Sequence, residues 1–177
     1  MKKTLIGAVA LVLMTACGGK QQTAEPADAD TTRTEAVAAD ATMEDPAWHN
    51  EGSVKWKGHT YTYVLNRAAD KSLPLVKDGL GQPYYDNSVD LSLRRDGEVF
   101  IAKRFTKEAF LEFLTPDYRA NAALQGIAFD QATDEGLRFG AFVGYPGSEE
   151  GIPLMIIIAS DGTMSVVKGE QPAAPGD

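Results

Sequence analysis

Alternating apolar and polar residues run through the chain from about residue 46 to residue 169, and they predict β-strands. The clearest cases are two pairs of runs that each flank an Asp-Gly pair, VDLSLRR-DG-EVFIAKRF and PLMIIIAS-DG-TMSVVK. An Asp-Gly pair between alternating runs is the strongest short-range signal for a hairpin with a type I′ turn. If Asp96 and Gly97 form a two-residue loop, Leu93 is expected opposite Phe100.

The run from Leu154 to Ala159 is apolar at every position. A continuous apolar run of this length is typical of a strand that is covered on both faces, and we expect it near the centre of its sheet. Further strands are expected at residues 53–56, 59–65, 125–130 and 137–143.

One helix is expected between the strands. Phe105, Thr106 and Phe110 stand where a hydrophobic staple around an N-cap would place them, and Pro116 ends the run. The order of elements predicts an α+β domain that is mainly antiparallel β. We expect about seven to eight strands in a sandwich-like or open-barrel-like arrangement, with one short amphipathic helix.

Residues 1–16 have the layout of a signal peptide. Lys2 and Lys3 precede an apolar stretch from Leu5 to Leu13, and small residues follow at Thr15 and Ala16. A helix needs about 20 apolar residues to cross the hydrocarbon core of a membrane. This shorter segment is therefore expected to direct export and to be removed.

Cys17 is the only cysteine, and the Met14-Thr15-Ala16 that precedes it resembles the bacterial lipobox. That resemblance implies a diacylglyceryl thioether on Cys17 and a third acyl chain on its amino group, and two or three chains make a stable membrane anchor. Gly18, where an aspartate would signal retention in the inner membrane, favours the outer membrane, with the domain facing the periplasm. The alternative is an ordinary signal peptide that is cleaved a few residues away.

Residues 17–45 are expected to form a lipidated, disordered, acidic tether. Seven acidic residues against Lys20 and Arg33 leave residues 18–45 with a net charge of −5, and the segment has too little apolar surface to offset its ordering entropy. A single β-rich globular domain is expected at residues 46–169. The Pro- and Ala-rich residues 170–177 are expected to be a disordered tail.

Charge and composition argue against several classes of partner and cofactor. Removal of Lys2 and Lys3 would take the formal net charge from −8 to −10, which argues against nucleic acid or an anionic membrane surface as a partner. No cofactor is expected, because the glycine-rich stretches lack the spacing of a phosphate-binding loop. No metal site is expected, because His49, His59 and a lipidated cysteine do not supply the ligands of a zinc site.

Catalytic motifs are also missing from the sequence. His59 is the one credible base for a Ser-His-Asp triad, and the chain has no GxSxG sequence. Carboxylates such as Asp86 and Asp90 leave open a hydrolase that uses a pair of acids.

The segment from Asp70 to Asn87, DKSLPLVKDGLGQPYYDN, is long for a loop in a compact domain. Long loops of this kind are often binding elements. Tyr84, Tyr85, Asp86 and Asn87 are therefore candidate recognition residues. The alternative is that the segment folds back as a packed lid over the core.

Basic residues near the first hairpin, among them Arg94 and Arg104, form a second candidate surface. This cluster would suit an anionic glycan or a lipid headgroup. Acidic residues are interleaved with it, so the alternative is a surface of salt bridges.

Three stretches together resemble one known family: SLPLVKDGLGQPYYDNSVDLSLRRDGEVFIAKRFTKEAF, LQGIAFD and FGAFVGYPGSEEGIPLMIIIASDG. Over residues 58–162 the chain is similar to the family called domain of unknown function 4738, small envelope lipoproteins of Bacteroidetes-type bacteria. The resemblance implies a lipoprotein with a β-rich domain, and it brings no catalytic residue, substrate or cofactor.

These features favour a membrane-anchored envelope lipoprotein that is not an enzyme. Such a module would bind an envelope protein, a glycan or a lipid through the segment Asp70–Asn87 and the neighbouring hairpin. One alternative is a carboxylate-dependent hydrolase of the envelope, which needs two acids in one cleft, one with a raised pKa. The other is a purely structural assembly protein, which would have a flat apolar patch and no pocket.

Overall fold

The computed structural model describes residues 41–169. The predicted signal peptide, Cys17, most of the predicted tether and the predicted tail lie outside the described residues. Among residues 41–169, no helix is long and apolar enough to cross a membrane.

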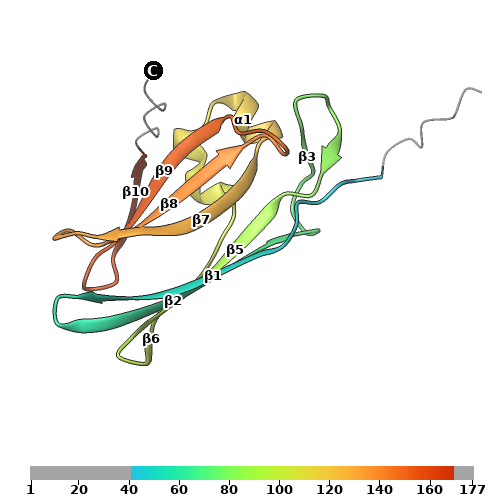
Figure 1. Cartoon of the computed structure of the whole chain (residues 1–177). Coiled ribbons are helices and arrows are strands. Elements are labelled where there is room, and N and C mark those ends of the chain that lie inside the picture. Colours follow the sequence, from blue (N-terminus) through green and yellow to red (C-terminus); the bar gives the residue numbers. More distant parts are fainter. Residues whose placement is uncertain (1–40, 170–177) are drawn as a thin grey trace, which may run out of the picture. The chain divides into compact units, whose positions relative to one another are not determined.

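The described residues form strands with a short helical connection. The elements are β1 (Trp48–Trp56), β2 (His59–Ala69), β3 (Val76–Lys77), β4 (Pro83–Tyr84), β5 (Asn87–Arg95), β6 (Glu98–Phe105), the 3₁₀ helix η1 (Lys107–Phe113), α1 (Pro116–Asn121), β7 (Ala123–Ala132), β8 (Leu137–Gly144), β9 (Gly151–Ile158) and β10 (Met164–Lys168). The first sheet has the order β1-β2-β5-β6 and the second has the order β10-β9-β8-β7, both antiparallel (Figure 1). β3 and β4 form a separate hairpin inserted between β2 and β5.

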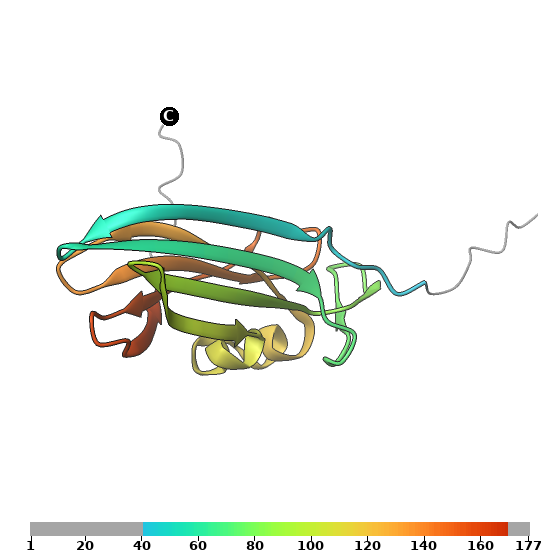
Figure 2. The same cartoon turned by 90° about the horizontal axis from the view of Figure 1, so that it is seen from below.

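The two sheets pack face to face around one hydrophobic core. Tyr61 and Leu91 from the first sheet and Phe139 and Ile156 from the second belong to the same buried cluster. Seen from below, the first sheet (cyan to olive) lies across the second (orange to red) (Figure 2). Because side chains alternate across a strand, every second residue reaches this core. The mainly antiparallel, sandwich-like fold predicted from the alternating pattern is confirmed.

The hairpin between β5 and β6 has the predicted turn but not the predicted register. Asp96 and Gly97 both have positive φ (51° and 90°), as a type I′ turn requires. Leu93 lies opposite Ile101, and not opposite Phe100 as expected, because the register shifts next to it. The shift is a β-bulge, which adds one residue to a strand and which an alternating pattern does not reveal.

The hairpin between β9 and β10 has a longer loop than predicted. Pairing stops at Ile158 opposite Met164, and Gly162 is the one residue of this loop with positive φ (89°). The prediction of a two-residue type I′ turn at Asp161 is therefore wrong. The Asp161 carboxylate instead accepts a hydrogen bond from the backbone N–H of Thr163 at 2.8 Å, as acidic residues do in longer turns.

Two helical segments connect β6 to β7, where one helix was expected. Pro116 does not end the helical region, because it starts α1, whose N-cap residue Thr115 accepts a hydrogen bond from the Tyr118 N–H. Proline suits the first helical position because its missing N–H needs no partner there. Phe110 and Leu114 from this connection are buried in the core, and the connection (yellow) lies next to β6 (Figure 2).

Residues 41–45, which were expected to belong to the tether, form a strap along the β3–β4 hairpin. The Met43 N–H donates to the Pro83 carbonyl and the Met43 carbonyl accepts from the Tyr85 N–H, both at 2.9 Å. The Asn87 side chain donates to the Asp45 carboxylate at 3.1 Å. The folded unit therefore includes residues that precede the predicted boundary at residue 46.

Candidate functional site

Asp86 and Asn87, which were expected on a binding surface, are buried at the start of β5, with 3% and 0% of their surface exposed. The Asp86 carboxylate accepts hydrogen bonds from the backbone N–H groups of Asn87 at 2.7 Å and of Leu124 at 3.0 Å. The Asn87 side chain donates to the Leu124 carbonyl at 3.1 Å. The two residues tie β5 to the start of β7, so they join the sheets and do not form a surface.

Lys107 completes this buried polar group. Its ammonium lies 3.3 Å from the Asp86 carboxylate and donates to the Ala122 carbonyl at 2.6 Å. Burial raises the pKa of Asp86, while Lys107 and the two backbone donors act in the opposite direction. A raised pKa can mark a functional acid, but here the partners of the carboxylate are groups that hold the sandwich together.

Tyr84 and Tyr85 are half-buried and sit beside the strap. Tyr84 pairs with Val76 in the β3–β4 hairpin, and the Lys71 ammonium lies 5.1 Å from the centre of the Tyr85 ring. Val76 is 1% exposed, whereas Leu80 at the turn of the hairpin is 95% exposed. The segment Asp70–Asn87 is therefore packed against the domain at its base and exposed at its tip. It is partly the packed lid and partly the exposed loop that the sequence allowed.

Arg104 is held by two carboxylates on the first sheet. Its guanidinium lies 2.9 Å from Asp90 and 3.5 Å from Asp70. The hydrogen bonds from Arg104 lower the pKa of Asp90, and hydrogen bonds from Ser72 lower that of Asp70. Arg94 is exposed and donates to the carbonyl of the adjacent turn at 2.9 Å. This cluster is the salt-bridged surface considered above, and acids with lowered pKa values are poor general acids.

The outer face of the second sheet is apolar. In a sandwich the outward residues are expected to be polar, yet Phe142, Pro153, Met155 and Ile157 point outward and are only half-buried. β9 is central, between β8 and β10, as its apolar run predicted. Its outward side chains, however, are partly exposed to solvent. A surface of this kind is typical of an interaction site.

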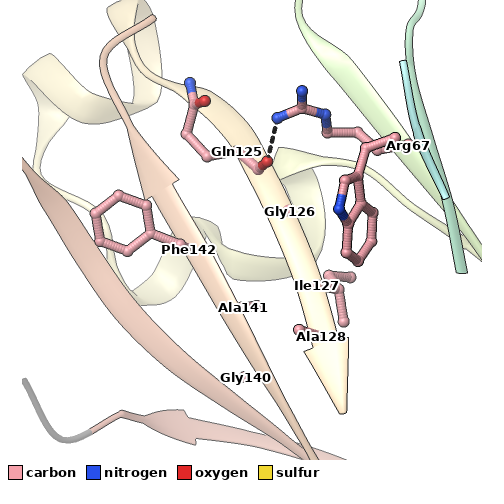
Figure 3. Close-up of a pocket in the computed structure, with 9 residues that line it drawn as sticks. Arg67, Gln125, Gly126, Ile127, Ala128, Gly140, Ala141 and Phe142 are labelled. Atoms are coloured by element: carbon pink, nitrogen blue, oxygen red, sulfur yellow. Dashed lines mark hydrogen bonds between the residues drawn. The ribbon is translucent and has the colours of Figure 1, made fainter. Parts of the chain in front are cut away.

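A groove of about 370 Å³ runs over this face (Figure 3). Its floor, here called the hollow, consists of Gly126, Ala128 and Gly140, from β7 and β8. Arg67 stands on one side of the hollow and Phe142 on the other (Figure 3). Trp48, which is 37% exposed, lines the same groove beside Arg67, its cross-strand neighbour.

The glycines of the hollow differ from other glycines of the same sheet. A Cβ at Gly151 would lie 2.5 Å from the Phe142 ring, so this glycine makes room for a side chain of the chain itself. A Cβ at Gly126 or Gly140 would meet nothing within 4 Å, and neither has positive φ. Glycine inside a strand weakens it and often marks a place where a ligand or another backbone comes close. Packing and backbone geometry within residues 41–169 do not require these two glycines.

Arg67 fixes the edge of the groove. The register of β7 against β8 shifts at Gln125, and the Gln125 carbonyl accepts a hydrogen bond from Arg67. A second amino group of Arg67 donates to the Pro46 carbonyl at 2.7 Å, and the Gln125 side chain donates to the Gly144 carbonyl at 3.3 Å. Both amino groups of Arg67 and the Gln125 amide are thus used within the chain, and the Arg67 Nε is buried without a partner, so the groove offers mainly apolar surface.

A second cavity of about 580 Å³ adjoins the groove and shares Gly140 and Phe142 with it. Glu149 and Glu150 are exposed at its rim. Its apolar wall, here called the ridge, consists of Phe142, Pro153 and Met155 on β8 and β9. The hollow and the ridge are neighbours, because Gly140 lies directly opposite Met155.

The sequence also carries a signal for this site. Gly126 and Gly140 lie in the middle of the predicted strands, in LQGIAFD and FGAFVG, and the β9 run is apolar at consecutive positions. Glycine inside a strand and apolar residues on both of its faces together suggest close contact on an outer face. The cross-strand register was needed to bring these residues together.

Fold and site define the described residues as an antiparallel β-sandwich domain with an apolar groove on one outer face. Residues 26–166 match the family described as Domain of unknown function (DUF4738), and the chain belongs to this family, as the resemblance noted above implied. No curated protein matches the chain. Within residues 41–169, no group of three or more His, Cys, Asp or Glu side chains is placed to hold a metal ion.

Proposed function

We propose that the chain is a lipid-anchored lipoprotein of the cell envelope whose domain is a non-enzymatic interaction module. The module binds another protein surface through the outer face of β7, β8 and β9. The observation that carries this proposal is the pair of glycines in the hollow, Gly126 and Gly140, whose Cβ positions are open. Selection for stability alone would favour a β-branched residue at such positions.

A protein surface fits this face better than a glycan or a lipid headgroup. A ligand rich in hydroxyl groups needs free donors and acceptors in its site, whereas Arg67 and Gln125 already bond to backbone carbonyls. An anionic headgroup would meet Arg67 at one edge of the groove, but Glu149 and Glu150 at the rim of the adjoining cavity would repel it. Apolar side chains from a partner need only the bare backbone and aromatic walls that the groove provides.

The two alternative functions receive less support from the geometry. A hydrolase that uses Asp86 and Asp90 would need both acids in one cleft, but Asp86 pairs with Lys107 in the interior and Asp90 with Arg104 at the surface. A purely structural role was expected to show a flat patch, and the apolar face here contains two adjoining cavities.

Lipid anchoring is proposed from Cys17 and the residues that precede it, which lie outside the described residues. The full precursor with Cys17→Ala is expected to leave the membrane fraction, while the wild-type chain carries the added mass of its acyl chains. Membrane fractionation and intact mass measure both effects. Lipid anchoring would be wrong if the variant still sediments with membranes and the wild-type chain carries no acyl mass.

The docking face is tested by placing a photoreactive benzoylphenylalanine at Ala128 in the full chain and irradiating the cells. Thr62, exposed on the outer face of the first sheet, is the matched control. Adducts of defined mass are expected from Ala128 and not from Thr62. Equal patterns from the two positions, or no adduct from Ala128, would overturn the proposal.

A further inference from the structure

We infer that the partner of this face is a second copy of the same chain, related by a two-fold axis that lies in the plane of the interface, along β8 near Gly140. The inference rests on the proposed function, since it names the partner of the same surface. In a two-fold interface one patch must be complementary to itself, so that each contact occurs twice. The shape and the charge of the face both meet this condition.

The shape is self-complementary because the hollow and the ridge lie side by side. Gly140 of the hollow is the cross-strand neighbour of Met155 in the ridge, and Gly126 is the neighbour of Phe142. A half-turn about an axis between them lays the ridge of each copy over the hollow of the other. The bare backbone at Gly126 then receives large side chains from β9 of the partner, and the two copies of Gly140 face each other.

The charges follow the same symmetry. Arg67 borders the groove on the side of β7, and Glu149 and Glu150 border the second cavity at the start of β9. Phe142 lies between these charges, since it lines both cavities. The half-turn that fits the ridge into the hollow therefore brings Arg67 of each copy towards the glutamates of the other. Opposite charges placed in this way fix the register of an interface more than they strengthen it.

The size of the face sets the strength of the dimer. Three strands spaced by about 4.8 Å, each rising about 3.3 Å per residue over about eight residues, cover roughly 400 Å². Two such faces bury on the order of 800 Å², which is below the roughly 1,200 Å² of stable interfaces and in the range of weak, transient ones. The dimer is therefore expected to be concentration-dependent, and attachment to a membrane would favour it by raising the local concentration.

The C-terminal residues 170–177 are a less suitable occupant. They follow Gly169, the last described residue, which lines the second cavity. They carry Glu170 and Asp177, which have the same sign of charge as Glu149 and Glu150 at its rim. Like charges placed together in an interface are unfavourable.

The test is disulfide cross-linking in cells that express the full chain with Gly140→Cys. Gly140 lies on β8, between β7 and β9, so the two copies of this residue meet at the axis, where a disulfide requires Cα atoms about 4.4–6.8 Å apart. The open Cβ position means that the variant is expected to fold. Thr62→Cys is the matched control. The wild-type chain has Cys17 as its one cysteine, so it shows how much cross-linking occurs through Cys17 alone.

The expected result is a covalent dimer from Gly140→Cys at a yield at least fivefold above that from Thr62→Cys. Adding Glu149→Lys and Glu150→Lys should lower the yield several-fold, because lysines would face the partner's Arg67. A chain that ends at Gly169 should cross-link as the full chain does. A dimer that appears only after this shortening would overturn the inference in favour of the tail.

Failure of this inference can be told apart from failure of the proposed function. If Gly140→Cys gives no dimer while the photoreactive group at Ala128 forms an adduct with a different protein, the second copy is ruled out and the docking face stands. If neither probe gives an adduct, both are overturned. A dimer whose yield does not respond to the two lysine substitutions would overturn the two-fold arrangement proposed here.

Discussion

The ion pair between Asp90 and Arg104 depends on the strand register of the first sheet. Because the strand register shifts at a bulge, Asp90 lies opposite Arg104 and not opposite Lys103, and Arg104 forms two hydrogen bonds with its carboxylate. These bonds lower the pKa of Asp90 below its ordinary value of 3.8. A carboxyl with a lowered pKa stabilises the fold above its unfolded pKa, and this contribution is lost as the pH falls through the folded value.

The variant Arg104→Gln is expected to raise the pKa of Asp90 towards its ordinary value, since the largest cause of the lowering is removed. A carboxyl-detected NMR titration of the folded protein measures this shift. Lys103→Gln removes the same charge from the next residue and should leave the Asp90 titration nearly unchanged. A larger response to Lys103→Gln would favour the register expected without the bulge.

The buried pair of Lys107 and Asp86 is expected to be sensitive to the loss of one partner. Lys107→Met leaves the Asp86 carboxylate buried without its cation, which should destabilise the fold by about 3–5 kcal/mol at neutral pH. Burial already raises the pKa of Asp86, and the variant raises it further. The stability contributed by such a group is complete below the unfolded pKa and is lost as the pH rises through the folded value.

The stability deficit of Lys107→Met relative to wild type should therefore shrink as the pH is lowered towards about 4. Urea unfolding at neutral and acidic pH measures this difference. The double variant Asp86→Asn with Lys107→Met should regain most of the stability at neutral pH, because an amide can still accept the two backbone hydrogen bonds. A deficit that is the same at both pH values would contradict the account of a buried unpaired charge.

At the scale of elements, glycines of the second sheet have opposite roles. Gly151 lets the Phe142 ring lie over β9, and a Cβ there would also approach the Val143 carbonyl to 2.6 Å. Gly140, on the neighbouring strand, leaves open space. The same residue type thus serves internal packing at one position and an open outer face at the other.

Gly140→Ala is expected to stabilise the fold by about 0.5–1 kcal/mol, because alanine loses less backbone entropy on folding. Gly151→Ala is expected to destabilise it by about 1–3 kcal/mol through overpacking. Thermal unfolding of the two variants under the same conditions gives the comparison. A loss of stability in Gly140→Ala would mean that the glycine is needed by the fold itself, and the main support for the docking face would be lost.

At the scale of the whole molecule, the strap links the predicted tether to the sandwich. Met43 bonds to Pro83 and Tyr85, which flank Tyr84 of β4, and Asp45 accepts from Asn87, which in turn bonds to Leu124 on β7. A pull on the N-terminal segment would therefore act on residues that join the two sheets.

A chain that starts at residue 46 is expected to be less stable than one that starts at residue 41. It loses the two Met43 backbone bonds and the Asp45 contact. At about 0.5–1.5 kcal/mol for each hydrogen bond, the loss should be about 2–4 kcal/mol. Urea unfolding of the two chains measures it, and equal midpoints would show that the strap contributes nothing to stability.

Local patterns along the sequence determined most of the elements. The alternation of apolar and polar residues predicted the antiparallel sandwich, because the side-chain period of a strand is a local property of the backbone. The Asp96-Gly97 turn was predicted correctly because both residues tolerate positive φ. The same signal failed at Asp161, where the loop is longer, and at Pro116, which starts a helix where it was expected to end one.

Contacts between distant segments determine which residues are exposed for binding. Asp86 and Asn87 look like loop-end polar residues in the sequence, but Leu124 and Lys107, distant in sequence, bury and bond them. The hollow likewise depends on the pairing of β7 with β8 and on a bulge at Gln125. The segments that form strands could be predicted from the sequence, since strand formation follows from local periodicity. The face each strand presents and what covers it depend on contacts between distant segments, and these the sequence alone does not reveal.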